Sequence, residues 1–286
     1  MTILGLGTAQ FGMPYGITNA KGQCSLSEIV EILKISIENK IQIIDTAVAY
    51  GQSEQFVGKA LQGLPPGLFK IITKVPSDCT SQAMQAVFQQ SLNNLRQNKI
   101  YGLLVHNAKQ LLLSTSDLLW NEMESFKAQG LVKKIGVSVY TGKEIDQILE
   151  RFNIDIIQLP INVFDQKLER EGYLQKLKNK GIEIHVRSIF LQGIILSKPE
   201  NLPSKLNELK PIIIKLNQYC KQKNVLPLQL ALAYIWHLKQ IDHALVGVTG
   251  VKEFQSILNS IVNLPTDLDY SIFNVNKEYL VNPAMW

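Results

Sequence analysis

Four side chains able to handle protons stand at or just beyond the ends of short apolar runs. Asp45, Lys74 and His106 each directly follow such a run, and Tyr50 comes soon after Asp45. A carboxylate, a phenol, an amine and an imidazole held together can donate, accept and stabilise a proton. Taken alone, Asp45 could instead cap the next helix and Tyr50 could pack on the surface. Because three successive runs end in an ionisable group, we expect the four to meet in one catalytic site.

The elements that would position these groups alternate along the chain. The pattern predicts strands at 3–8, 41–44, 69–73, 100–105, 134–138, 154–159, 181–187 and 244–248. It predicts helices at 53–61, 82–95, 116–128, 142–151, 166–179, 205–223, 227–238 and 252–261, and an earlier one that opens with a capping box at Ser25 and Glu28. We expect a long surface loop over 188–203 and a mostly irregular tail over 264–286.

Eight strands alternating with helices predict an α/β fold, a (β/α)₈ TIM barrel. The carboxyl ends of its parallel strands would open onto one face, where chemistry is done. No repeat or linker divides the chain, so we expect one domain over 1–286. An open doubly wound sheet is the alternative. Against it, Gly5, Gly7 and Gly12 do not form a dinucleotide fingerprint, because Gln10 stands where the third glycine belongs.

Composition describes an ordinary globular protein of 286 residues, with 46% hydrophobic and 19% charged residues and a net charge of +5. The positive charge is not gathered into blocks, so we do not expect nucleic-acid binding. No apolar run has membrane-spanning length, and the first residues do not form a signal peptide. Cys24, Cys79 and Cys220 stand far apart, as reduced thiols of a cytoplasmic protein would.

The three remaining histidines have no ligand spacing. We interpret His185, His237 and His243 as structural and expect no metal site.

The chain resembles the aldo-keto reductases over nearly its whole length. The residues that carry the resemblance are Asp45-Thr46-Ala47, Tyr50-Gly51, Ser53-Glu54, Gly58, Ala60-Leu61, Lys74, His106, Gly136-Val137-Ser138, Gln158, Asn162 and Gln192-Gly193. The resemblance implies that a nicotinamide cofactor exchanges hydride with a carbonyl carbon. It implies Tyr50 as the general acid, with a pKa lowered by Lys74 from its ordinary value near 10. Asp45 would keep Lys74 charged, and His106 would donate a hydrogen bond to the substrate oxygen.

The resemblance also implies cofactor contacts in the later strands and loops. Ser138 and Gln158 would hold the carboxamide of nicotinamide. The family often stacks a tyrosine on the nicotinamide ring from the seventh strand, where this chain has Ser188; Phe190 or Arg187 could compensate. Further contacts are expected from Gln192, Gly193 and Asn259.

The turn after the last strand is the expected phosphate site. Gly247 and Thr249 could present backbone amides to the pyrophosphate at a helix start, although a plain strand-to-helix turn is the alternative. Lys252 favours NADP(H) slightly over NAD(H), although Gln255 stands where an arginine is common. The partner would be a small carbonyl or alcohol substrate, and the protein would be a monomer or a weak homo-oligomer.

Two other functions remain open at this point. A barrel aldolase would use Lys74 as a Schiff-base nucleophile, which borohydride would trap. A non-catalytic accessory protein would bind nicotinamide only, but it would have no need of the acid Tyr50.

Overall fold

Eight parallel strands close into a barrel in the computed structural model, which describes residues 2–286. The strands are β1 (Ile3–Gly7), β2 (Ile43–Asp45), β3 (Lys70–Val75), β4 (Ile100–Val105), β5 (Val132–Ser138), β6 (Ile156–Pro160), β7 (Glu183–Arg187) and β8 (His243–Gly247). Each strand pairs with its neighbour in sequence, and β1 also pairs with β8, with Gly5 beside both Ile43 and Leu245. The predicted (β/α)₈ barrel is confirmed.

The interior of the barrel is a packed layer of branched side chains, and not a channel. Ile43, Ile72, Leu104, Ile156 and Leu245 form a buried cluster of their own, separate from the larger core. They come from β2, β3, β4, β6 and β8, as expected for side chains that point inward from the strands. The strands are therefore held rigidly, and so are the residues at their ends.

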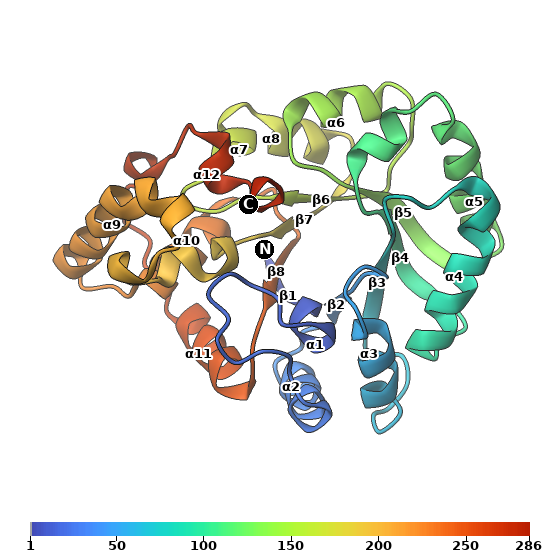
Figure 1. Ribbon diagram of the computed structural model, residues 1–286, viewed down its shortest axis with the longest axis horizontal. Helices are drawn as coiled ribbons and strands as arrows, with labels where there is room; N and C mark the ends of the chain where they lie inside the picture. The colour runs from blue at the N-terminus through green and yellow to red at the C-terminus, as the bar shows by residue number, and fades with distance from the viewer. Residues whose placement is uncertain (1) are drawn as a thin grey trace.

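Helices form an outer ring around the strands, as Figure 1 shows. They are α2 (Leu26–Glu38), α3 (Ser53–Leu61), α4 (Ser81–Leu95), α5 (Ser116–Ala128), α6 (Gly142–Leu149), α7 (Lys167–Arg170), α8 (Tyr173–Asn179), α9 (Lys210–Lys223), α10 (Pro227–His237) and α11 (Val251–Val262), with the single turns α1 (Ala9–Gly12) and α12 (Glu278–Val281). The capping box that opens α2 is present, with the amide of Glu28 donating to Ser25 Oγ. The larger buried core lies between this ring and the strands.

Two predicted helices are wrong in detail. The helix expected over 166–179 is two short helices, α7 and α8, because Gly172 between them has φ 79° and cannot continue a right-handed helix. The helix expected over 205–223 begins as the 3-10 helix Ser204–Leu209 and becomes α-helical only at Lys210.

The predicted surface loop over 188–203 is also wrong, since it is folded and partly buried. It contains the 3-10 helices Leu191–Leu196 and Pro199–Asn201. The side chains of Ile189, Leu191 and Ile194 are fully or almost fully buried. This segment follows β7, so it belongs to the catalytic face of a barrel of this type.

The tail is largely irregular, as predicted, with short turns such as Ser271–Phe273 and Pro283–Met285. Among residues 2–286, no helix is long and apolar enough to span a membrane.

Candidate active site

A buried ion pair joins the ends of β2 and β3. Lys74 Nζ lies 2.6 Å from Asp45 Oδ2 and also donates to the carbonyl oxygen of Thr46 at 3.0 Å. The residues are 0% and 4% exposed. A buried charge needs a close opposite charge, and each of these residues supplies it for the other. Burial lowers the pKa of Lys74, and Asp45 opposes that shift.

Tyr50 and His106 lie beside this pair. Lys74 Nζ is 3.5 Å from the phenol oxygen of Tyr50, at the long limit of a hydrogen bond, and 5.0 Å from the ring centroid. The rings of Tyr50 and His106 meet edge to face, with centroids 5.6 Å apart. The structure therefore brings together all four residues singled out at the strand ends.

The protonation of the two rings is set by burial. Burial raises the pKa of the Tyr50 phenol, and the Asp45 carboxylate raises it further. The expected net lowering of this pKa is not found, because burial and the Asp45 carboxylate outweigh the opposing charge of Arg187. Burial and the charge of Lys74 lower the pKa of His106 to about 4. At neutral pH the site thus holds a protonated phenol and a neutral imidazole.

The two residues expected to hold the carboxamide lie beside each other on β5 and β6, and Gln158 contacts the ion pair. Gln158 donates from Nε2 to Asp45 Oδ1 at 2.7 Å. Its Oε1 is buried and has no hydrogen-bond partner within the described chain. Ser138, at the end of β5, accepts from Nε of Arg187 at 3.3 Å. A buried acceptor without a donor suits a ligand that carries an N–H group, such as a carboxamide.

A cavity of about 620 Å³ opens at this face of the barrel. Tyr50, His106 and Asp45 line it, whereas Lys74 is not among the lining residues. Eight expected cofactor residues also line it: Ser138, Gln158, Ser188, Phe190, Gln192, Gly193, Gly247 and Thr249. The volume is in the range of small-molecule sites. Apart from Lys74, which lies buried behind Asp45, and the two residues described next, the predicted catalytic and cofactor residues therefore share one cavity.

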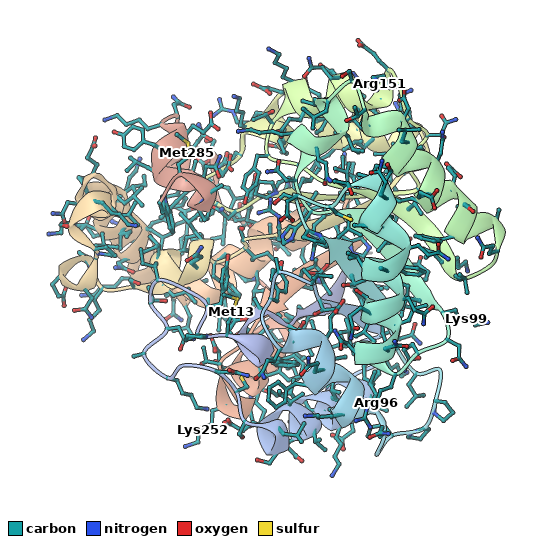
Figure 2. The ribbon with its side chains drawn as sticks, turned by 45° about the vertical axis from the view of Figure 1, so that its right-hand side comes forward. Met13, Arg96, Lys99, Arg151, Lys252 and Met285 are labelled. Atoms are coloured by element: carbon teal, nitrogen blue, oxygen red, sulfur yellow. The ribbon has the colours of Figure 1, made fainter. Side chains whose placement is uncertain are left out.

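Lys252 and Asn259 do not line this cavity. Both are exposed on α11, and Figure 2 shows Lys252 at the periphery of the molecule. The residue that reaches the cavity from α11 is Glu253, which accepts from the backbone N–H and the hydroxyl of Thr249 at 2.7 and 2.8 Å. One amide expected to hold a phosphate is thus already bound to a carboxylate.

Gln192 has a structural task that the sequence did not indicate. Its Oε1 accepts from the amide of Ile17 at 3.0 Å, and its carbonyl oxygen accepts from the hydroxyl of Thr18 at 2.9 Å. These bonds join the loop after β7 to the loop after β1 beside the cavity. Ser188, Leu191 and Gln192 all have positive φ, a strained backbone state often found at functional sites.

The sequence suggested Arg187 only as a possible replacement for the tyrosine that stacks on nicotinamide. It did not indicate Tyr140 as a site residue. The Arg187 guanidinium lies 4.2 Å from the centroid of the Tyr140 ring, and both residues line the cavity. Arg187 is the last residue of β7, so its position at a strand end was the available signal.

A second polar cluster lies at the opposite, amino-terminal mouth of the barrel. Glu183, His185 and His243 come within 4.8 Å of one another, so the two histidines are closer to a ligand arrangement than their spacing suggested. Glu183 already binds the phenol of Tyr101 at 2.6 Å and His185 at 2.7 Å, and it pairs with Lys134. These bonds satisfy the carboxylate as part of a structural network.

Comparisons with known proteins bear on the family and the fold of the chain. The family model described as "Aldo/keto reductase family" matches residues 3–273. An uncharacterised oxidoreductase of Schizosaccharomyces pombe is 24% identical over 91% of this chain and 88% of its own. A glyoxal reductase of Bacillus subtilis is 26% identical over 59% of this chain and 61% of its own. Among solved structures, an aldo-keto reductase of Bacillus halodurans in its holo form shares the fold, with a TM-score of 0.76 and 21% identity over 94% of this chain and 89% of its own.

Proposed function

Because the chain belongs to the aldo/keto reductase family and is an oxidoreductase of that fold, we propose that it interconverts a carbonyl compound and an alcohol with a nicotinamide cofactor. The observation that carries the proposal is the contact of Tyr50 with both Lys74 and His106 at one cavity. A carbonyl oxygen that reaches the phenol of Tyr50 there also comes close to His106.

The residues divide the work as follows. Tyr50 donates its proton to the carbonyl oxygen as negative charge develops on it. His106, held neutral by its low pKa of about 4, orients that oxygen with an N–H donor. Asp45 and Lys74 lock the phenol in place and give the phenolate a nearby cation once the proton has left.

A nicotinamide bound in the cavity would supply or accept the hydride. Gln158 Oε1 and the Ser138 hydroxyl would hold its carboxamide, and the unpartnered Gln158 oxygen is the observation that fits this group. Gly193 and Gly247 would border the rest of the cofactor. Lys252 lies away from the cavity and Glu253 reaches into it, so the side chains near α11 add no support to the slight preference for NADP(H).

The aldolase alternative is disfavoured by the position of Lys74. A Schiff-base lysine must reach the substrate carbon, whereas this amine is fully buried, bound to Asp45 and absent from the cavity lining.

The proposal is tested by replacing Tyr50 with phenylalanine and screening aldehydes, ketones and sugars with NADH and NADPH at the cofactor absorbance. We expect kcat to fall by about 10²–10⁴, the usual contribution of a general acid, while fluorescence titration shows cofactor affinity nearly unchanged. Tyr279→Phe, in the exposed tail, is the control and should keep wild-type turnover. Normal turnover by Tyr50→Phe would show that another group donates the proton.

A further inference from the structure

One cation in the active-site cavity has no anion beside it among residues 2–286. Arg187 is half-buried, and its three recorded acceptors are the neutral oxygens of Ser138, Val139 and Ser188, at 3.3, 3.2 and 3.4 Å. Within residues 2–286, no carboxylate lies in ion-pairing distance of it. Partial burial of an unpaired charge is unfavourable, so a ligand that brings an anion would relieve it.

We propose that Arg187 is an anion-recognition group for the substrate, and that the protein acts on carbonyl compounds carrying a carboxylate or phosphate. This inference rests on the proposed function and names the substrate class of the same site. The planar guanidinium matches both anions, because its parallel N–H groups can donate to two oxygens at once.

The orientation of Arg187 separates this role from cofactor phosphate binding. The residue ends β7, and its Nε and terminal nitrogen donate to Ser138 and Val139, at the end of β5 and just beyond it. The guanidinium therefore points from β7 across β6 towards β5. The turn expected to hold the pyrophosphate follows β8, on the other side of β7.

The guanidinium is also held ready for a ligand. It lies on the ring of Tyr140 with its carbon 4.2 Å from the centroid, which fixes the plane of the fork. An anchor already ordered before binding loses less entropy when the ligand arrives.

Arg187 lies within electrostatic reach of the proposed chemistry. Its charge acts to lower the pKa of Tyr50 and of His106, which line the same cavity. A substrate whose carbonyl oxygen meets those two residues can thus place a charged substituent on the guanidinium.

The other charges near the cavity are already satisfied. Lys21, which also lines it, pairs with Glu28 at 2.5 Å, and Lys74 pairs with Asp45 at 2.6 Å. Of the cations of the described chain that line the cavity, Arg187 is therefore the one without a carboxylate partner.

The test compares matched substrates that differ in charge. One pair is 4-carboxybenzaldehyde with its neutral amide, 4-formylbenzamide, and the other is glyceraldehyde 3-phosphate with glyceraldehyde. Wild type, Arg187→Gln and Arg187→Lys are assayed for kcat/KM, for substrate binding by calorimetry, and for cofactor affinity by fluorescence. Lys21→Gln is the matched control, since it removes a cavity cation that already has a partner.

We expect wild type to prefer the charged member of at least one pair by tenfold or more, and the two pairs show whether carboxylate or phosphate is recognised. Arg187→Gln should bring the ratio close to one, Arg187→Lys should restore part of it, and Lys21→Gln should leave it unchanged. The inference would be overturned if wild type showed a charged-to-neutral kcat/KM ratio near one, or if a high ratio survived Arg187→Gln. It would also be overturned if Arg187→Gln lowered kcat/KM equally for both substrates of a pair and weakened cofactor binding. If wild type reduces no substrate the proposed function fails, and the calorimetric ratio still decides the role of Arg187.

Discussion

Replacing Lys74 with methionine should strongly destabilise the barrel, because it leaves Asp45 as a buried carboxylate without a cation. Asp45 is 4% exposed, and its remaining recorded side-chain partner is the amide of Gln158 at 2.7 Å. Breaking a buried pair in this way costs about 3–5 kcal/mol of the free energy of unfolding. Asp45→Asn alone should cost a similar amount, since it leaves the Lys74 ammonium buried instead.

The double variant Asp45→Asn/Lys74→Met should be much less affected than either single variant. It removes both charges, and asparagine keeps an oxygen for the Gln158 amide. We expect it to unfold within about 2 kcal/mol of wild type, which gives a coupling energy of several kcal/mol between the two sites. Urea unfolding followed by circular dichroism at pH 7 measures all four corners of this cycle.

The pH dependence gives an independent signature. In Lys74→Met the buried carboxylate has no cation beside it, and burial disfavours the charged form of such a group. The loss relative to wild type should therefore be largest at neutral pH and smaller in acid. Lys277→Met, which breaks the exposed pair with Glu208, is the control and should leave the urea midpoint unchanged. The reasoning would be refuted if the urea midpoint of Lys74→Met equalled that of the control. It would also be refuted if the loss of unfolding free energy in the double variant were the sum of the losses in the two single variants.

Two further outcomes follow from the structure. Burial lowers the pKa of both His106 and His243 from 6.5 to about 4, so the unfolded chain binds more protons between these values. The contribution of each histidine should be full above pH 6.5 and fall by up to about 3 kcal/mol as the pH drops to 4, which the raised pKa of Asp165, about 6, offsets only in part; a flat urea midpoint over this window would contradict the burial of neutral imidazoles. Gly136→Ala should destabilise by more than about 3 kcal/mol in the same assay, because its Cβ would lie 1.7 Å from the carbonyl oxygen of Ile156 on the next strand. Gly63→Ala, where nothing lies within 4 Å, is its control, and equal midpoints for the two would show that β5 and β6 can separate at little cost.

The alternation of apolar runs with amphipathic segments was enough to predict the barrel, because the strands are largely buried on both faces and most helices on one. What the pattern could not show was where a helix breaks. The break between α7 and α8 depends on the positive φ of Gly172, which its identity as a glycine permits but does not require. The folded segment after β7 was missed because Ile189, Leu191 and Ile194 are buried by contacts distant in sequence, in 3-10 turns that have no 3.6-residue period.

The four residues at the strand ends could be predicted because the barrel itself brings strand ends together. Arg187 stands at such an end too, but a sequence cannot show that its charge lacks a partner, since that depends on which side chains surround it. Lys252 differs from these residues. The resemblance to the family implied a phosphate contact there, whereas Lys252 is exposed on α11 and the next residue, Glu253, is the one that lines the cavity.

The protonation state of the site bears on the direction of the proposed reaction. Alcohol oxidation needs the oxygen of Tyr50 as a base, and therefore as a phenolate. Burial and the Asp45 carboxylate both raise the pKa of this phenol, so the resting site holds the proton that carbonyl reduction consumes. An anionic substrate bound at Arg187 would place a second negative charge near the phenol and offset the charge of Arg187, which favours the phenolate. The pKa of the phenol would then rise further. Under the proposed function, carbonyl reduction should therefore keep its rate at neutral pH, while alcohol oxidation should accelerate as the pH rises towards the pKa of Tyr50. Steady-state rates in both directions between pH 6 and 10 measure this difference, and parallel profiles would show that a group other than Tyr50 carries the proton.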